Sequence, residues 1–190
     1  METMRFSKGF NIGDFYWQII DSWPVVSWSS IDYYNNRKAQ HYRMRDVFTP
    51  LALGIESKDG KLNYYSMSDY LQDRNNLKLS VRVVDFNTGV KKEFTQKNHF
   101  FYWPNKLNLP ETEVYSNIIY ADEEYILTLW SNKLAKDVFI EVPLTGTQFS
   151  DNFIDLLPNE KVTIKITSPK LRAKDKTPVT IKHVRETYNL

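Results

Sequence analysis

A series of short β-type segments, which fills the chain from residue 51 onward, most constrains the fold. In residues 77–84 apolar side chains alternate with polar ones, the pattern of a strand with one buried face. Turn sequences separate several segments, with Lys-Asp-Gly at 58–60 and Asn-Thr-Gly at 87–89. The pattern predicts a mainly β protein with immunoglobulin-like β-sandwich modules. The expected strands are residues 51–55, 62–67, 77–84, 94–103, 125–130, 138–142, 161–166 and 179–183.

The first fifty residues have a different character. Residues 14–20 read Asp-Phe-Tyr-Trp-Gln-Ile-Ile, a nearly continuous apolar run that is typical of a strand buried on both faces. Asn35 and Asn36 can cap a helix over residues 37–48, which Thr49-Pro50 would end. A strand, a long loop and a helix in this order are typical of the end of a (β/α)8 barrel. A barrel remnant is therefore expected ahead of the sandwich modules.

Charge and composition exclude several classes of partner. With 25 basic and 23 acidic residues the net charge is +2, so we expect no nucleic-acid partner and no membrane partner. The basic residues that gather between Lys161 and Arg185 predict a solvated strand face, and an anion site is the alternative. A soluble protein without a signal peptide is expected, because no long apolar run is present. The absence of cysteine leaves the cellular compartment open.

Few residue patterns in this chain carry catalytic chemistry. The three histidines are far apart in a chain without cysteine, so neither a metal nor another cofactor is expected. A retaining glycosidase needs two carboxyl groups about 5 to 5.5 Å apart. Asn159-Glu160 has the form of an acid/base dipeptide, but it follows Leu-Leu-Pro and predicts a turn. The other candidate glutamates lie near turns or strand ends, where a solvated carboxyl group is a poor general acid: Glu56, Glu93, Glu111, Glu113, Glu123 and Glu124.

Aromatic residues are concentrated between residues 15 and 34. Trp17, Trp23 and Trp28 lie there among polar residues that include Gln18, Asp21 and Asp32. Flat aromatic rings stack on the apolar faces of sugars, while polar neighbours bind the hydroxyl groups. Carbohydrate binding is one reading of this mixture. The other is that most of these rings fill the core of the barrel and its contact with the next module.

Long stretches of the sequence resemble the β-mannosidases of glycoside hydrolase family 2. The resemblance lies in Tyr-Trp-Gln at 16–18, Asp-Ser-Trp-Pro at 21–24, Ser-Trp-Ser-Ser-Ile-Asp-Tyr-Tyr at 27–34, and Lys-Ala and His-Tyr at 38–42. It continues in Leu-Ala-Lys-Asp-Val-Phe-Ile-Glu at 134–141, in residues 149–160, and in Ile-Lys-His-Val-Arg-Glu-Thr-Tyr at 181–188. Departures occur at Ile20, at Ser22 and at 35–37, where the family has Asn, Cys and Gly-Arg-Trp.

The resemblance implies a parent enzyme that hydrolyses terminal, non-reducing β-D-mannose residues with retention. It makes Trp17 a wall of the mannose subsite and Asp21 a weaker candidate that positions other groups. The two catalytic glutamates of the family would precede Met1, so no catalytic residue is assigned and the chain is expected to be inactive alone. The partners implied are β-mannosides or manno-oligosaccharides and the remainder of the catalytic barrel.

The resemblance also sets the expected domain boundaries. Residues 1–48 would be the last strand and helix of the barrel domain, 49–110 an incomplete immunoglobulin-like sandwich, and 111–190 a C-terminal immunoglobulin-like sandwich. Several family strands are missing between residues 83–86 and 100–104. One alternative is a stand-alone carbohydrate-binding or structural module, with an aromatic platform around Tyr115, Tyr120 or Trp130. Another is a gene product without selected activity, which exposed apolar surface at residues 15–20 would favour.

Overall fold

The computed structural model describes Arg5, Gly13 and residues 15–70, 81–89, 91–94 and 107–189. The chain divides into two compact units. The first comprises Met1–Trp17, Arg43–Val83 and Lys91–Leu107. The second comprises Gln18–Tyr42, Val84–Val90 and Asn108–Leu190.

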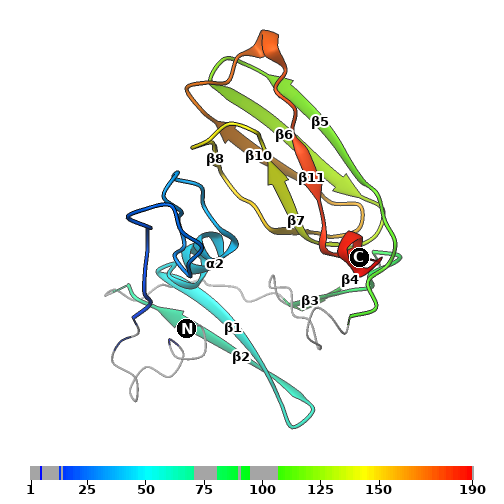
Figure 1. The fold of residues 1–190 in the computed structure, drawn as a ribbon. Helices are drawn as coiled ribbons and strands as arrows, with labels where there is room; N and C mark the ends of the chain where they lie inside the picture. The colour runs from blue at the N-terminus through cyan, green and yellow to red at the C-terminus, as the bar shows by residue number, and fades with distance from the viewer. Residues whose placement is uncertain are drawn as a thin grey trace. The chain divides into compact units, whose positions relative to one another are not determined.

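The second unit contains a β-sandwich of two antiparallel sheets (Figure 1). In the larger sheet the strand order is β5 (Val114–Tyr120), β6 (Glu124–Ser131), β10 (Lys161–Thr167) and β8 (Gln148–Phe149). In the smaller sheet the order is β11 (Thr180–Lys182), β7 (Ala135–Glu141) and β9 (Ile154–Leu156). The 3-10 helix η2 (Ala173–Asp175) lies between β10 and β11, and a second one, η3 (Val184–Asn189), follows β11. The expected mainly β, immunoglobulin-like sandwich is confirmed.

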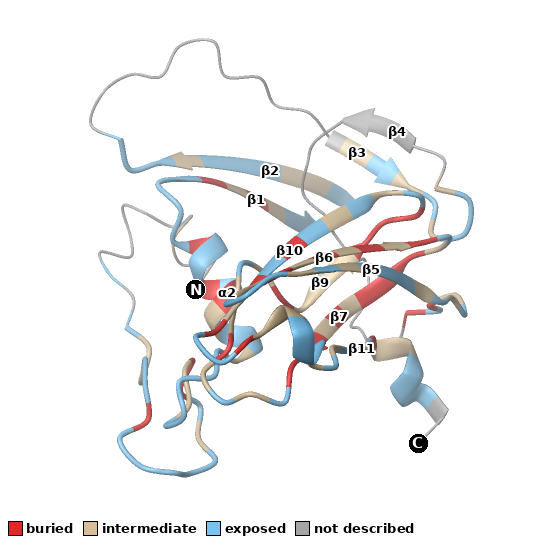
Figure 2. Cartoon of the chain, turned by 90° about the horizontal axis from the view of Figure 1, so that it is seen from above, coloured by how far each residue is buried: buried red, intermediate tan, exposed pale blue. Residues whose placement is uncertain are grey.

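The sandwich core is built from alternate residues of the central strands (Figure 2). On β6, Tyr125, Leu127 and Leu129 are fully buried, and the residues between them face outward. Burying each such side chain contributes about 1.5 to 3 kcal/mol. The rest of the buried core comes from β7, β9, β10 and the adjoining turns, with Ala135, Val138, Ile140, Val142, Leu156, Ile164, Ile166 and Leu171.

A buried asparagine fixes the edge of the smaller sheet. Asn152 is 3% exposed, its Oδ1 accepts a 2.8 Å hydrogen bond from the Ile140 amide, and its Nδ2 donates a 2.8 Å bond to the Ile140 carbonyl. The side chain thus satisfies both backbone groups of a core residue. The pairing of β7 with β9 is irregular between Ala135 and Val138.

Two hairpin-like elements precede the sandwich in the chain. In the first unit, β1 (Leu51–Lys58) pairs with β2 (Lys61–Ser68) through a two-residue turn. Both turn residues have positive φ, 52° at Asp59 and 71° at Gly60, as a tight β-hairpin turn requires. A second two-stranded sheet joins β3 (Val81–Val84) to β4 (Lys91–Phe94).

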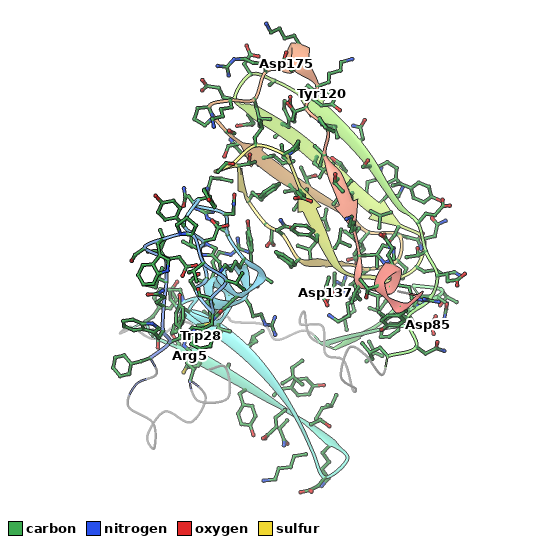
Figure 3. All side chains as sticks on the ribbon, in the orientation of Figure 1. Arg5, Trp28, Asp85, Tyr120, Asp137 and Asp175 are labelled. Atoms are coloured by element: carbon green, nitrogen blue, oxygen red, sulfur yellow. The ribbon has the colours of Figure 1, made fainter. Side chains whose placement is uncertain are left out.

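The turn after β3 is attached to the end of the sandwich in the second unit. Asp85 Oδ1 accepts hydrogen bonds from the amides of Asn87 and Thr88, at 3.0 and 2.8 Å. The carbonyl of Phe86 accepts a 2.9 Å hydrogen bond from the amide of Leu134. Figure 3 labels Asp85 at the same end of the sandwich as Asp137, while Tyr120 and Asp175 lie at the opposite end.

Helix α2 (Ala39–Val47) confirms the helix expected over residues 37–48. The strand expected over residues 14–20 is not confirmed. Residues 15–20 form only a one-residue bridge at Ile20, and Phe15, Trp17 and Ile19 are exposed by 96%, 77% and 60%. A strand buried on both faces needs paired neighbours on both sides, whereas backbone hydrogen bonds join residues 18–21 only to Ser30 and Ile31 within the described part of the chain. The barrel remnant is therefore not confirmed.

The remaining strand predictions have mixed outcomes. Those at 51–55, 62–67, 125–130, 138–142, 161–166 and 179–183 are confirmed as β1, β2, β6, β7, β10 and β11. Residues 77–80 and 95–103 lie outside the described residues, as do 100–104, next to which missing family strands were expected. The short strands β8 and β9 and the edge strand β5 were not predicted. Among the described residues, no helix is long and apolar enough to cross a membrane.

Candidate functional site

A loop between residues 18 and 38 carries most of the residues singled out by the sequence. Backbone hydrogen bonds hold it together, among them those from the Ile31 amide to the Ile19 carbonyl at 2.8 Å and from the Asp21 amide to the Ile31 carbonyl at 3.1 Å. Ile31 also forms an antiparallel bridge with Arg37. These contacts hold the two ends of the loop side by side.

Asp21 lies at the centre of this loop and is 4% exposed. Its Oδ1 accepts hydrogen bonds from Ser27 Oγ at 2.6 Å and from Gln18 Nε2 at 3.2 Å, and its Oδ2 accepts one from Ser29 Oγ at 2.7 Å. Lys38 Nζ lies 3.4 Å from the same Oδ2. Four donors from the protein surround this carboxylate, so its hydrogen bonds stabilise the loop from its interior.

Lys38 connects Asp21 to the backbone on the other side of the loop. Its Nζ donates to Ser29 Oγ at 2.8 Å and to the Ser27 carbonyl at 3.1 Å. The hydrogen bonds from Ser27 and Ser29, which exceed the opposing effect of burial, lower the pKa of Asp21 below its usual 3.8. Asp21 is consequently ionised at neutral pH.

The apolar side chains of the same loop face solvent. Trp23 and Trp28 are 64% and 75% exposed, and Val26 is completely exposed. Tyr33 and Tyr34 are half exposed and meet edge to face, with ring centroids 5.3 Å apart. A well-ordered polar interior with a large apolar exterior is unusual for an isolated surface loop, because exposed patches of this kind mark interaction sites.

The far end of the loop contacts the sandwich inside the second unit. Gln148 Nε2 donates to the Asn35 carbonyl at 3.3 Å, and the Gly146 amide donates to Asn36 Oδ1 at 3.4 Å. Tyr42, at the start of α2, is 3% exposed and lies 6.3 Å from the ring of Phe153, which stacks on Phe139. Residues 36–39 and the ends of β7 and β8 enclose a pocket of about 460 Å³. These contacts anchor the loop to the sandwich.

The two residues that the sequence singled out lie in different surroundings. Trp17 belongs to the first unit and presents a ring that is 77% exposed, which is available for stacking. Asp21 belongs to the second unit and its carboxylate is enclosed, so it reaches a ligand only through the loop that it orders. Sequence reasoning missed the partners of Asp21, which are Ser27, Ser29 and Lys38. A buried carboxylate predicts such partners, but their identity needs the loop path.

Other candidates are explained by local structure. Asn159 has φ 61° and the Glu160 amide donates to the Leu157 carbonyl, so the expected turn at Asn159-Glu160 is confirmed. The lysines of the basic tail are exposed at positions 161, 165, 170, 174, 176 and 182, as a solvated face predicts. In the part of the chain that the structure describes, no group of three acidic or histidine side chains is placed to hold a metal ion.

Comparison with known proteins identifies the sandwich and its relatives. Residues 109–187 match the mannosidase-type Ig-fold domain. The chain is 43% identical over 77 residues to a β-mannosidase of Capra hircus, and the aligned region covers 40% of this chain and 8% of that protein. It is 25% identical over 164 residues to β-mannosidase B of Emericella nidulans, covering 76% of this chain and 19% of the relative.

A solved structure supports the same fold. A β-D-mannosidase of Dictyoglomus thermophilum superposes with a TM-score of 0.73 at 23% identity, over 96% of this chain and 27% of that enzyme. The chain therefore spans between 8% and 27% of the lengths of these three proteins. Residues 109–187 thus match an Ig-fold domain of the mannosidase type, and parts of the chain are similar to β-mannosidases.

Proposed function

We propose that this chain acts as part of a retaining β-mannosidase that removes terminal, non-reducing β-D-mannose residues, and that it does not hydrolyse them alone. One observation carries the proposal. The loop at residues 18–38 has a fixed polar interior around Asp21 but exposes Trp23, Val26 and Trp28 to solvent. Exposed apolar side chains on an ordered loop favour a contact with another protein surface. The related β-mannosidases are much longer than this chain, so the rest of such an enzyme is a candidate for that surface.

The remainder of a catalytic barrel is the partner that we propose for this loop. A folded apolar exterior contributes to binding in proportion to the area that it buries, at about 25 cal/mol per Å² before the costs of association. The buried network of Asp21 and Lys38 lowers those costs, because the loop is already ordered when the partner arrives. The two catalytic carboxylates of the retaining mechanism would come from that partner.

In the assembled site, Trp17 is proposed as a wall that stacks on the mannose ring. Its large exposed ring supports this role, because an indole offers a flat apolar face to the C–H groups of a sugar. Asp21 is proposed as a positioning residue. Its hydrogen bonds to Ser27 and Ser29 support that role, since they hold the loop after Trp17 in one conformation.

Complementation tests the proposal. The purified chain is assayed with a chromogenic β-D-mannopyranoside, first alone and then mixed with the Dictyoglomus β-mannosidase from which the matching region has been deleted. We expect no turnover from either polypeptide and turnover from the mixture. Trp17→Ala in the mixture should raise KM or lower kcat at least tenfold, whereas Trp17→Phe, which keeps a flat ring, should retain most of the activity.

Two outcomes would overturn the proposal. Turnover by the chain alone would show that it holds its own carboxylate pair. An inactive mixture, in which analytical ultracentrifugation also detects no complex, would leave the exposed apolar loop as the surface of a remnant without function. The exposed side chains of residues 15–28 fit this second reading as well, so the complex has to be measured directly.

A further inference from the structure

We propose a second sugar-binding site on the sandwich itself, in a pocket of about 490 Å³ between the start of β5 and helix η3. The residues that carry the argument are Glu111, Glu113, Tyr115, His183, Arg185 and Glu186. All six belong to the second unit, and η3 lies beside the beginning of β5 in Figure 1. The volume falls within the range of about 300 to 1,000 Å³ that is usual for small-molecule pockets.

The aromatic wall of this pocket is Tyr115. The strand register places Tyr115 opposite Trp130 and Trp130 opposite Lys161. Tyr115 stacks on Trp130 with ring centroids 5.9 Å apart, and Lys161 Nζ lies 5.3 Å from the centre of the Trp130 ring. Trp130 therefore has a neighbour from each adjoining strand. Among the described strands β5 is the edge of its sheet, so none of them lies beside the second face of Tyr115, which is offered to a sugar ring.

A fixed donor accompanies the aromatic ring. Arg185 Nε donates to the Leu109 carbonyl at 3.2 Å, its Nη2 donates to Glu111 at 3.1 Å, and its guanidinium lies 5.2 Å from the centre of the Tyr188 ring. Within the described residues, Arg185 Nη1 makes no hydrogen bond. The guanidinium is thus held in place with N–H groups to spare, which is how a protein presents donors to sugar hydroxyls.

Acceptors are present as well. The side chain of Glu113 is exposed, and its carboxylate has no partner among the described residues. Glu111 is paired with Arg185, and Glu186 lies 3.2 Å from His183 Nε2. His183 is 6% exposed, lines the pocket, and has a buried Nδ1 without a hydrogen-bond partner in the described part of the chain. Because Nδ1 is inaccessible to solvent, it lies behind the pocket wall, and the His183 nitrogen that meets Glu186 is Nε2.

The combination favours a neutral pyranose over a cation. Three carboxylates beside an aromatic ring could attract an ammonium group, as aromatic cages do. However, the anchored guanidinium of Arg185 would repel a cation, and Glu111 is already neutralised by it. Sugar hydroxyls both donate and accept hydrogen bonds, so they match a pocket that offers Glu113 as an acceptor and Arg185 as a donor. The site rests on the proposed function only for the choice of mannosides as the first probes.

NMR titration of the full chain tests the second site. Methyl β-D-mannopyranoside and β-1,4-mannobiose are added to the ¹⁵N-labelled protein, and backbone shifts are mapped. We expect saturable shifts at residues 111–115 and 183–186, with a Kd in the millimolar to micromolar range. Tyr115→Ala should weaken binding about tenfold or more, since loss of a stacking ring removes the main apolar contact. Glu113→Gln, an exposed change that leaves packing intact, should weaken it severalfold.

Controls separate this site from the loop at residues 18–38. Tyr64→Ala removes a tyrosine of similar exposure from β2 and should leave the affinity unchanged. The affinity is read from the shifts at residues 111–115 and 183–186 alone, so the second site stands or falls independently of the complementation assay. The proposal would be overturned if neither sugar shifts residues 111–115 at tens of millimolar. It would equally be overturned if choline saturates the pocket while the sugars do not.

Discussion

The ammonium group of Lys38 lies 3.4 Å from Oδ2 of Asp21, whose side chain is inaccessible to solvent. Seventeen positions separate the two residues in the sequence. The contact therefore closes the loop at residues 18–38 across its base, and Ser29 Oγ lies within hydrogen-bonding distance of both groups. A buried carboxylate of this kind fixes one loop conformation, because any other conformation would leave a charge without donors.

Removal of either charge should loosen the loop and leave the sandwich intact. We expect Asp21→Asn and Lys38→Met to accelerate amide exchange at Ser30 and Ile31 by roughly tenfold or more, because each change removes the ion pair that closes the loop. Lys170→Met, at an exposed lysine, is the matched control and should change nothing. Exchange at Ser30 and Ile31 that is unchanged in Asp21→Asn would contradict the structural role of Asp21.

The loop should also open in acid. Hydrogen bonds from Ser27 and Ser29 lower the pKa of Asp21 below 3.8, so its ionised form stabilises the folded loop. That contribution is complete well above pH 3.8 and is lost as the pH falls through the lowered pKa of the folded state. Protection factors at Ser30 and Ile31, which correct for intrinsic exchange, should fall over this range. In Asp21→Asn they should already be low and should not depend on pH there.

Asn152 offers a test of the buried polar contact in the sandwich. Asn152→Ala leaves the amide and the carbonyl of Ile140 unpaired in the core, and each unpaired group costs about 1 to 3 kcal/mol. Asn117→Ala, at an exposed position on β5, should change the free energy of unfolding by less than about 0.5 kcal/mol. Urea unfolding followed by circular dichroism measures both.

Asn152→Asp adds a pH dependence to that test. A carboxylate still accepts from the Ile140 amide but cannot donate to the carbonyl 2.8 Å away, whereas a protonated carboxyl group can donate. The Asp variant should therefore be strongly destabilised at pH 7 and should recover part of its stability relative to the parent chain near pH 4. Equal destabilisation at pH 7 and pH 4 would mean that the hydrogen bond donated to the Ile140 carbonyl contributes little to stability.

The sequence predicted the central strands well and the edges poorly. β10 alternates strictly between polar and apolar residues, and β6 has an apolar residue at every buried position from 125 to 129, so the strands at 125–130 and 161–166 could be predicted from the residues alone. Strand β5 reads Val-Tyr-Ser-Asn-Ile-Ile-Tyr, where the alternation is interrupted, because an edge strand has less buried surface to enforce it. The apolar run at residues 15–20 wrongly predicted a strand buried on both faces. Such a strand needs a paired strand on each side, and the described part of the chain does not provide both.

The candidate sites were predictable to different degrees. Trp17 and Asp21 came from resemblance, and the surrounding mixture of aromatic and polar residues made them plausible from composition. The pocket beside Tyr115 could not be located from sequence, because Glu113 and Arg185 are brought together only when η3 returns to the start of β5. An aromatic platform around Tyr115, Tyr120 or Trp130 was one alternative, but the stacking of Tyr115 on Trp130 required the strand register.

Gly89 tests whether the turn at residues 85–89 is packed against the sandwich. Gly60 and Gly89 both have positive φ, 71° and 68°, but a Cβ at Gly60 would meet no atom within 4 Å. At Gly89 it would lie 2.9 Å from Cβ of the buried Pro158 and 3.2 Å from its carbonyl oxygen. Alanine should cost about 1 to 2 kcal/mol of backbone strain at either position, and overlap should add about 1 to 3 kcal/mol at Gly89 alone.

Asparagine separates the two effects, because it tolerates the left-handed conformation but still carries a Cβ. Gly60→Asn should therefore be nearly neutral, whereas Gly89→Asn should retain the cost of overlap with Pro158. Amide exchange at Leu134, whose N–H donates to the Phe86 carbonyl in the same turn, reports the local effect. If Gly89→Asn leaves that amide as protected as in the parent chain, the turn does not pack against Pro158 in solution, and the short segment between β3 and β4 is only loosely attached to the sandwich.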